Sequence, residues 1–572
     1  MSNLRENRAA AGEIGATWRV SLLILTSRLL GFARLVLFIH LFAGYRWVSD
    51  AFIFAFRIPN LFRNLLGEGA LSASFIPVFM RTRLKSGDES AAGLGSAVLS
   101  ALGLVGGALA ALGAGLALAL ESLAGDDAKT ALALRLIALL FPFMPLVCLA
   151  AILGGMLQSL RRFALPAAAS IIINLGFLAG FAQVYWGQCG GNLENLDPGR
   201  ATGSIALFVL GAGLVEALVQ WLALARAGIR LAPSLSFAHP GLRETATAFF
   251  PAALGLGLVQ VNAFFDSLIA GWLSLSDPGA VTYLEIGVRF MQLPLGVFGA
   301  AIAAVYFPAL TASAALGEKE LFFERLIRAA RMSMFLILPS SALLVAMADP
   351  VIRLAYQRPD LAFDHAAVYR ASLALILYSG GLIFYSFRQI LVRAFYALGD
   401  YSFPVKTSAA MVILNLALNL ILIHCPDPHR LWNPSYFLGW NLAPGSFPGG
   451  NRLGEAGLAL STLLTAAVDC AVLGLGLRKR LFPGLSAKFR SGELARLLHT
   501  ALRLAATSLA LGIMTWLYRN SIPYDPGFIL LLERVAVPGL LALGTFYLIG
   551  IILPLPEMEE FIPWLRKRNG RH

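Results

Sequence analysis

Apolar residues run through most of the chain in long stretches, and short polar segments separate these stretches. A transmembrane helix needs about 20 mainly apolar residues to cross the hydrocarbon core of a bilayer. Because lipid cannot hydrogen-bond an open backbone, such stretches are expected to be helical. We predict fourteen spans, at residues 18–43, 48–79, 93–121, 131–158, 165–187, 203–227, 245–273, 281–311, 331–348, 368–397, 404–424, 453–477, 496–518 and 528–553.

The composition agrees with an all-α polytopic membrane protein. Of the 572 residues, 58% are apolar and only 13% are charged, whereas soluble proteins carry about 25% charged residues. The N-terminal stretch MSNLRENRAAAGEIGATWRV is polar for too long to be a signal peptide, and no small-residue cleavage site follows it. We therefore expect the first span to be retained.

The formal net charge is +13, and the distribution of this charge indicates topology rather than nucleic-acid binding. If the N-terminus lies inside, the inner segments hold most of the arginine and lysine. The outer loops, such as ESLAGDDAK and GNLENLDPGR, tend to be acidic. This alternation follows the positive-inside rule, so it predicts an even number of spans with both termini in the cytoplasm.

Two stretches in different halves of the chain share a pattern. RIPNLFRNLLGEGALSASFIP (57–77) and RFMQLPLGVFGAAIAAVYFP (289–308) each begin with arginine, have glycine ten residues later and end with proline. Transporters often consist of repeated halves, although chance similarity is the alternative for matches this short. The repeat predicts an N-terminal lobe (1–230), a C-terminal lobe (231–480) and two extra spans with a cytoplasmic tail (481–572).

Charged residues inside spans are the strongest functional signal, because each costs at least about 2.5 kcal/mol at mid-bilayer. Guanidinium groups match phosphate oxygens bidentately and stay charged at neutral pH. Arginines from several helices therefore predict a hydrated cavity that binds a phosphorylated or pyrophosphorylated ligand. The alternative is that some of them reach the interface or pair with nearby acids. The charged residues of the first, second and eighth spans on which this prediction rests are Arg28, Arg34, Asp50, Arg57, Arg63, Glu68, Glu285 and Arg289.

A second, weaker group of polar residues lies in other spans. Asp266 is in the seventh span, and Asn415 and Asn419 share one face of the eleventh. A carboxylate with amide oxygens is suited to a coupling cation or a proton relay. The alternative is hydrogen bonding that holds helices together. Glu216 and Asp469 are further acids within spans for which the sequence indicates no partner.

The four cysteines show no CxxC or metal-ligand spacing. Cys148 and Cys470 lie within predicted spans, where packing is the expected role. Cys189 and Cys425 fall in predicted outer loops, and the sequence leaves a bridge between them open.

These motifs resemble those of a known family. TSRLLGFARLVLF, SDAFIFAFRIPNLFRNLLGEGALSASFIPVF, VRFMQLPLGVFGAAIAAVYFPAL and VRAFYALGDYSFPVKT are similar to the MurJ (MviN) lipid II flippases of the multidrug/oligosaccharidyl-lipid/polysaccharide (MOP) exporter superfamily. The resemblance covers roughly the whole chain. It implies two six-helix lobes in a V around a central cavity, plus two C-terminal helices that form a groove for the lipid tail.

The resemblance also implies a substrate and its site. The substrate would be lipid II, an undecaprenyl-pyrophosphate-linked disaccharide pentapeptide. The family usually has an aspartate directly after the second arginine of the first span, where this chain has Leu35, so Asp50 or Glu68 would have to replace it. The outer loop at 425–453 is longer than expected. By motif, the functional positions of the family fall on Arg28, Arg34, Arg63, Arg289, Asp50 and Glu68.

The resulting hypothesis is a flippase of the bacterial inner membrane that works by alternating access and is not an enzyme. No cofactor is expected, while a coupling monovalent ion or the membrane potential stays open as the driving force. Expected partners are lipid II, membrane lipids and other cell-wall synthesis proteins, not nucleic acid. The alternatives are an exporter of another polyprenyl-linked oligosaccharide, a drug/cation antiporter with an acid-dominated cavity, and a membrane enzyme with clustered acids or histidines.

Overall fold

The structure is a computed structural model. It describes residue 23, residues 26–62, 72–123, 127–160, 162, 164–232, 239–356, 365–425, 453–521 and 532–541, and residue 544. These residues form helices and turns, with no strand among them, so the predicted all-α class is confirmed. The predicted site residues Arg63 and Glu68 lie outside the described residues, as does the 426–452 part of the long loop.

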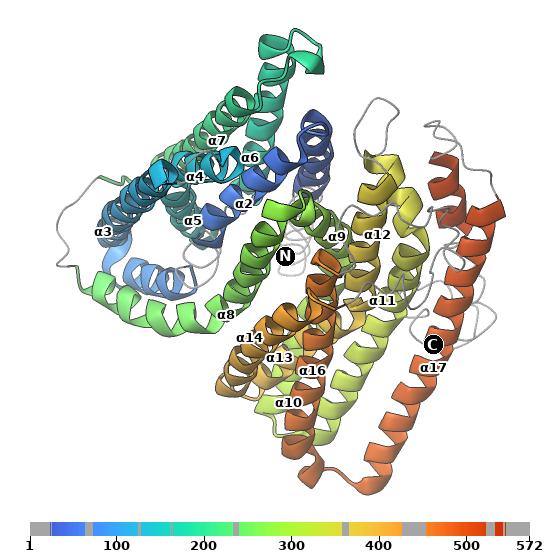
Figure 1. Cartoon of the computed structure of the whole chain (residues 1–572). Coiled ribbons are helices and arrows are strands. Elements are labelled where there is room, and N and C mark those ends of the chain that lie inside the picture. Colours follow the sequence, from blue (N-terminus) through green and yellow to red (C-terminus); the bar gives the residue numbers. More distant parts are fainter. Residues whose placement is uncertain are drawn as a thin grey trace, which may run out of the picture. The chain divides into compact units, whose positions relative to one another are not determined.

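The helices form two compact units, residues 1–278 and 279–572 (Figure 1). The first unit contains a helix at 26–41, here called the N-terminal helix, followed by α2 (Arg46–Phe62), α3 (Ser72–Leu123), α4 (Ala128–Leu140), α5 (Phe143–Ser159), α6 (Ala164–Ala182), η2 (Gln183–Gln188), η3 (Leu193–Asn195), α7 (Pro198–Arg226) and α8 (Pro240–Ser276). The second contains α9 (Ala280–Pro294), η4 (Leu295–Gly299), α10 (Ala300–Ala315), α11 (Lys319–Tyr356), α12 (His365–Gly380), α13 (Leu382–Ala397), α14 (Ser402–Leu422), α16 (Glu455–Leu481), η6 (Phe482–Gly484) and α17 (Ala487–Ser521).

Nine helical segments of the described residues are long and apolar enough to cross a membrane. Together with the family assignment below, they make the chain an integral, multi-pass membrane protein, whereas the number fourteen stays a prediction. The nine segments are Ser74–Leu123, Ala128–Ser159, Ala164–Gln188, Pro198–Arg226, Lys319–Tyr356, His365–Ala397, Ser402–Leu422, Glu455–Leu481 and Ala487–Ser521.

Local sequence sets where the helices of the first unit break and begin. Gly87, with φ 85°, interrupts α3, because this backbone conformation suits glycine. The carboxylate of Asp127 caps α4: it accepts the Lys129 N–H at 3.2 Å and the Thr130 hydroxyl at 2.6 Å. The Thr130 hydrogen bond is the main reason why the pKa of Asp127 is lowered.

Within the first unit, helix α8 makes polar contacts with α3 and α2. Arg81 of α3 pairs with Glu244 of α8 at 2.5 Å, and Arg57 of α2 donates to the Ser267 hydroxyl of α8. A compact unit that ends at residue 278 thus includes the seventh predicted span. The lobe boundaries at 230/231 and 480/481 are inferred from the internal repeat of the sequence, and they stay a prediction.

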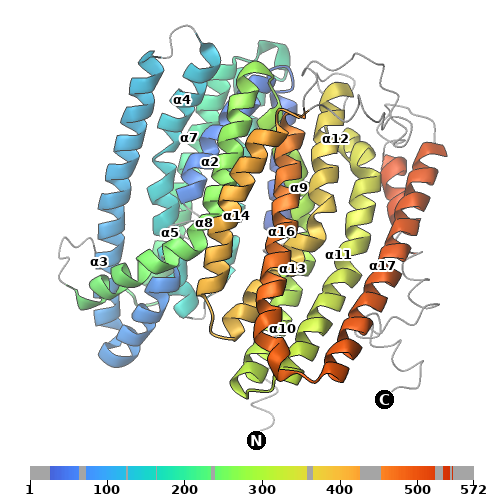
Figure 2. The same cartoon turned by 60° about the horizontal axis from the view of Figure 1, so that its bottom comes forward.

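The second unit is built around α11, against which α17 packs along its length, as both views show (Figures 1 and 2). Met334 and Phe335 of α11 share a buried cluster with Leu504 of α17. The predicted eighth span is not one regular helix, because a π-helical turn, η4, separates α9 from α10 directly after Pro294. Such turns are often found at functional sites.

Candidate functional site

In the first unit, the N-terminal helix carries Arg34 and rests on α6. Asn174 of α6 donates to the main-chain oxygen of Ser27 at 3.1 Å. One turn later, the ring of Phe177 lies under the guanidinium of Arg34, whose Cζ is 4.4 Å from the ring centroid. Because the two helices meet at successive turns, the orientation of Arg34 depends on α6.

Helix α2 supplies Asp50 and Arg57 of the predicted site and a further aromatic neighbour of Arg34. Phe56 offers a second, more distant ring, 5.9 Å from the Arg34 Cζ. Asp50 is buried, at 4% exposure. Arg57 is partly buried and contacts Ser267, the residue after Asp266. The first unit contains these described residues of the prediction, each of which has at least one interaction partner: Arg28, Arg34, Asp50, Arg57 and Asp266.

Arg289 belongs to the second unit and is held differently. Its Nε–H donates to the Glu285 carboxylate at 2.7 Å, one turn earlier on α9. The Glu285 side chain is 10% exposed and that of Arg289 is 34% exposed. Among the described residues, the structure gives Arg289 no second hydrogen bond, so the pair with Glu285 does not use its Nη1 and Nη2 donors.

The second unit also contains buried ion pairs that the sequence did not reveal. Asp469 of α16 accepts from the Nε of Arg388 of α13 at 2.5 Å, and Ser408 of α14 accepts from Nη2 of the same arginine at 3.0 Å. Arg370 of α12 pairs with Glu455 of α16. No spacing pattern could have found these pairs, because their partners lie on helices far apart in the sequence.

Asn415 and Asn419 form a hydrogen-bonded cluster between α14 and α16, which lie side by side (Figures 1 and 2). Asn419 donates to the Asn415 side-chain oxygen at 3.0 Å and accepts from the Ser461 hydroxyl. Asn415 also donates to Ser461 at 3.3 Å and to Thr465 at 3.5 Å. These contacts are what we expect if the asparagines hold helices together by hydrogen bonding. Asp266, the third residue of the coupling-ion prediction, belongs to the first unit. The coupling-ion prediction stays a prediction.

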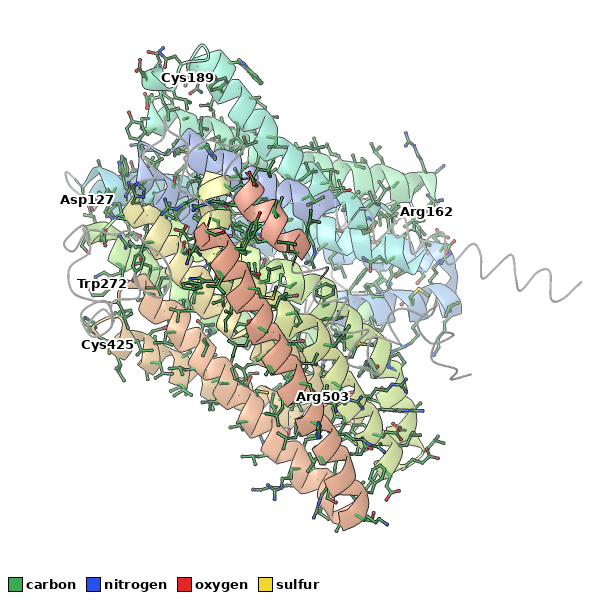
Figure 3. All side chains as sticks on the ribbon, turned by 90° about the vertical axis from the view of Figure 1, so that its right-hand side faces the viewer. Asp127, Arg162, Cys189, Trp272, Cys425 and Arg503 are labelled. Atoms are coloured by element: carbon green, nitrogen blue, oxygen red, sulfur yellow. The ribbon has the colours of Figure 1, made fainter. Side chains whose placement is uncertain are left out.

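The cysteines and metal-ligating residues define no further centre in the part of the chain that the structure describes. No group of three or more His, Cys, Asp and Glu side chains there could hold a metal ion. All four cysteines are free thiols. Cys189 lies in the turn between η2 and η3 (Figure 3), and burial raises the pKa of its thiol.

Solved structures of two transporters share the fold of this chain. An inward-closed lipid II flippase MurJ matches with a TM-score of 0.70 at 20% identity, over 94% of this chain and 99% of that one. An inward-facing MATE-family multidrug transporter of the MOP superfamily matches with a TM-score of 0.61 at 12% identity, over 81% and 98% of the two chains. At these identities the likeness shows the fold alone, which both of these transporters share with this chain.

Sequence comparison then defines the family. Residues 40–428 match the family model described as lipid II flippase MurJ. A probable lipid II flippase MurJ of Vibrio cholerae is 30% identical over 80% of this chain and 81% of its own length. A relative so named in Bdellovibrio bacteriovorus is 30% identical over 81% of each chain. The chain belongs to the MurJ lipid II flippase family. This is a family of transporters rather than enzymes, in agreement with the prediction.

Proposed function

We propose that this protein is a lipid II flippase, which moves the undecaprenyl-pyrophosphate-linked peptidoglycan precursor from the inner to the outer leaflet by alternating access. The observation that carries the proposal is the family match, together with relatives at 30% identity that are named probable lipid II flippases. No covalent bond is made or broken in such a cycle, so the protein has to supply binding groups and a change of conformation.

We assign a role in binding the diphosphate to Arg28 and Arg34 of the first unit and, separately, to Arg289 of the second. The partial exposure of all three side chains supports this assignment, because a group that binds a ligand must be reachable. Guanidinium groups suit a diphosphate, because each can donate two parallel N–H bonds. We assign supporting roles to Asp50 and Arg57. Sequence motif alone adds Arg63 and Glu68.

The same proposal covers location and topology. The protein would lie in the bacterial inner membrane with both termini in the cytoplasm, as the basic inner segments indicate. An anion held at the inner face would be driven outward by the membrane potential and by the negative surface of the inner leaflet. Lipid II would be its main partner.

A drug/cation antiporter is the second candidate, because the MATE fold is shared. A cation carrier needs acids that face its substrate. Here Glu285 is 10% exposed and already paired with Arg289. The transport assay below separates the two candidates when it is run with labelled lipid II and, in parallel, with a fluorescent organic cation.

The test uses the purified protein in proteoliposomes that contain fluorescent lipid II. We expect protein-dependent movement of lipid II between leaflets and none of the organic cation; the opposite result would establish the antiporter. In flippase-depleted bacteria, the variants Arg28→Ala, Arg34→Ala and Arg289→Ala should fail to restore growth although they accumulate in the membrane. Arg200→Ala is the control, because this side chain is 84% exposed at the start of α7.

A further inference from the structure

We propose that Phe177 of α6 is a positioning residue for substrate binding, because its ring holds the Arg34 guanidinium in place. The inference rests on the proposed function, since it assumes that Arg34 binds the diphosphate of lipid II. Neither sequence pattern nor family resemblance pointed to Phe177, which reads as one more apolar residue of a membrane span.

The geometry is that of a cation–π contact. The Arg34 Cζ lies 4.4 Å from the centroid of Phe177, well within the distance of about 6 Å at which a cation over a ring is attracted. The ring itself is 3% exposed, so water does not weaken the attraction from that side. Arginine commonly stacks on aromatic faces in this way.

Stacking has a particular advantage for a ligand-binding arginine. A ring under the face of a guanidinium uses none of its N–H groups, which point outward in the plane of the group. An acidic partner, in contrast, takes up donors, as Glu285 does with the Nε–H of Arg289. Phe177 can therefore orient Arg34 without competing with phosphate oxygens for those donors.

The ring is itself held in place by its neighbours. Phe56 of α2 contacts it edge-on, with the ring centroids 5.3 Å apart and the planes at 83°. Phe181, one turn later on α6, lies 6.0 Å from Phe177 and 6.0 Å from Phe38 of the N-terminal helix. On the other side, Asn174 fastens α6 to Ser27. Phe177 is thus a fixed support rather than a mobile side chain.

The test replaces Phe177 by phenylalanines that carry one, two or three fluorine atoms, which withdraw charge from the ring face while almost preserving its shape. The dissociation constant of lipid II is measured for each purified protein in nanodiscs. We expect affinity to fall with each fluorine and by about tenfold across the series, and by at least about tenfold in Phe177→Leu. The same series at Phe75, a fully buried ring of α3, is the control and should leave affinity unchanged, because no cation–π contact joins Phe75 to Arg34 among the described residues.

A second series in the Arg34→Ala background makes the assignment specific. There the fluorines at Phe177 should change affinity no further, and a persisting decline would overturn the inference. An unchanged affinity across the first series, in a wild-type protein that binds lipid II, would also overturn it. If the wild-type protein itself neither binds nor moves lipid II, the proposed function fails instead.

Discussion

Glu285 lies one helical turn before Arg289 on α9, and its carboxylate accepts the Nε–H of that arginine at 2.7 Å. The acid is nearly buried and the arginine is one-third exposed. Residues four apart on a helix face each other, so this pair forms within α9 alone. Glu285 thereby fixes the direction in which the two terminal nitrogens of Arg289 are presented.

This relationship predicts different effects for two substitutions of the acid. Glu285→Gln keeps an oxygen that accepts the Nε–H, so lipid II affinity should stay within about threefold of wild type. Glu285→Leu removes the acceptor, and the resulting loss of one charged hydrogen bond should lower affinity by about tenfold. Binding to purified protein in nanodiscs measures both.

The matched control is the pair Asp349 and Arg353 of α11, which has the same spacing and is also buried. Asp349→Asn should leave lipid II affinity unchanged in the folded protein. Wild-type affinity in Glu285→Leu, or an equal loss in the Asp349 variant, would contradict the positioning role.

The ion pair of the partly buried Arg388 with the buried Asp469 predicts a large effect on stability. The Asp469 side chain is 4% exposed, and its removal would leave the guanidinium without its counter-charge. Breaking one side of a buried ion pair typically costs about 3–5 kcal/mol. The free energy of unfolding of Asp469→Ala, measured in detergent, should fall by that amount. For comparison, Arg81 and Glu244 are 53% and 48% exposed, so Arg81→Ala should cost about 1 kcal/mol or less. Equal losses in the two variants would refute this ranking.

The amide cluster of α14 and α16 predicts how the protein responds to ions. Asn419→Ala removes the hydrogen bonds to Asn415 and Ser461, which should lower the free energy of unfolding by about 1–2 kcal/mol. Since the amides are already hydrogen-bonded to protein groups, sodium, potassium and lithium should change the Tm equally, in the variant as in wild type. A Tm increase specific to one cation in wild type, lost in Asn419→Ala, would instead establish a coupling-ion site.

Two glycines of α16 predict opposite effects of the same substitution. A Cβ at Gly457 would lie 2.7 Å from the main-chain carbonyl carbon of Leu422, so Gly457→Ala has to push α14 away and should cost about 1–3 kcal/mol. A Cβ at Gly474 would meet no atom within 4 Å. Gly474→Ala should therefore raise stability by about 0.5–1 kcal/mol, because alanine favours a helix. Thermal unfolding of both variants checks the difference in sign.

The helices themselves could be predicted from the sequence, because length and apolarity are properties of single segments. The break at Gly87 falls in the polar segment between the second and third predicted spans, so the sequence indicated it as well. The π-helical turn η4 could not be predicted, because it separates α9 from α10 inside the predicted eighth span.

The site was predictable only in part, for a related reason. Arg34 and Arg289 could be identified because a charged side chain inside a membrane span is energetically unfavourable, and this is evident from the sequence whatever its partners are. The groups that orient these arginines are not equally easy to predict. Glu285 lies four residues before Arg289 on the same helix. Phe177 is far from Arg34 in the sequence and is one apolar residue among many. Likewise, Asp469 had no evident partner until α13 and α16 were placed together.

The hydrogen-bonded amides and hydroxyls between α14 and α16 also bear on how these helices dock during membrane insertion. Both helices are apolar over most of their length. In lipid, apolar side chains gain no hydrophobic free energy from contact with each other, so they favour no particular register. Sliding α16 by one turn would separate Ser461 from Asn419 and break the interhelical hydrogen bonds, at about 1–2 kcal/mol. A newly inserted α16 thus has one favourable register on α14, specified by a few polar side chains rather than by the leucines around them.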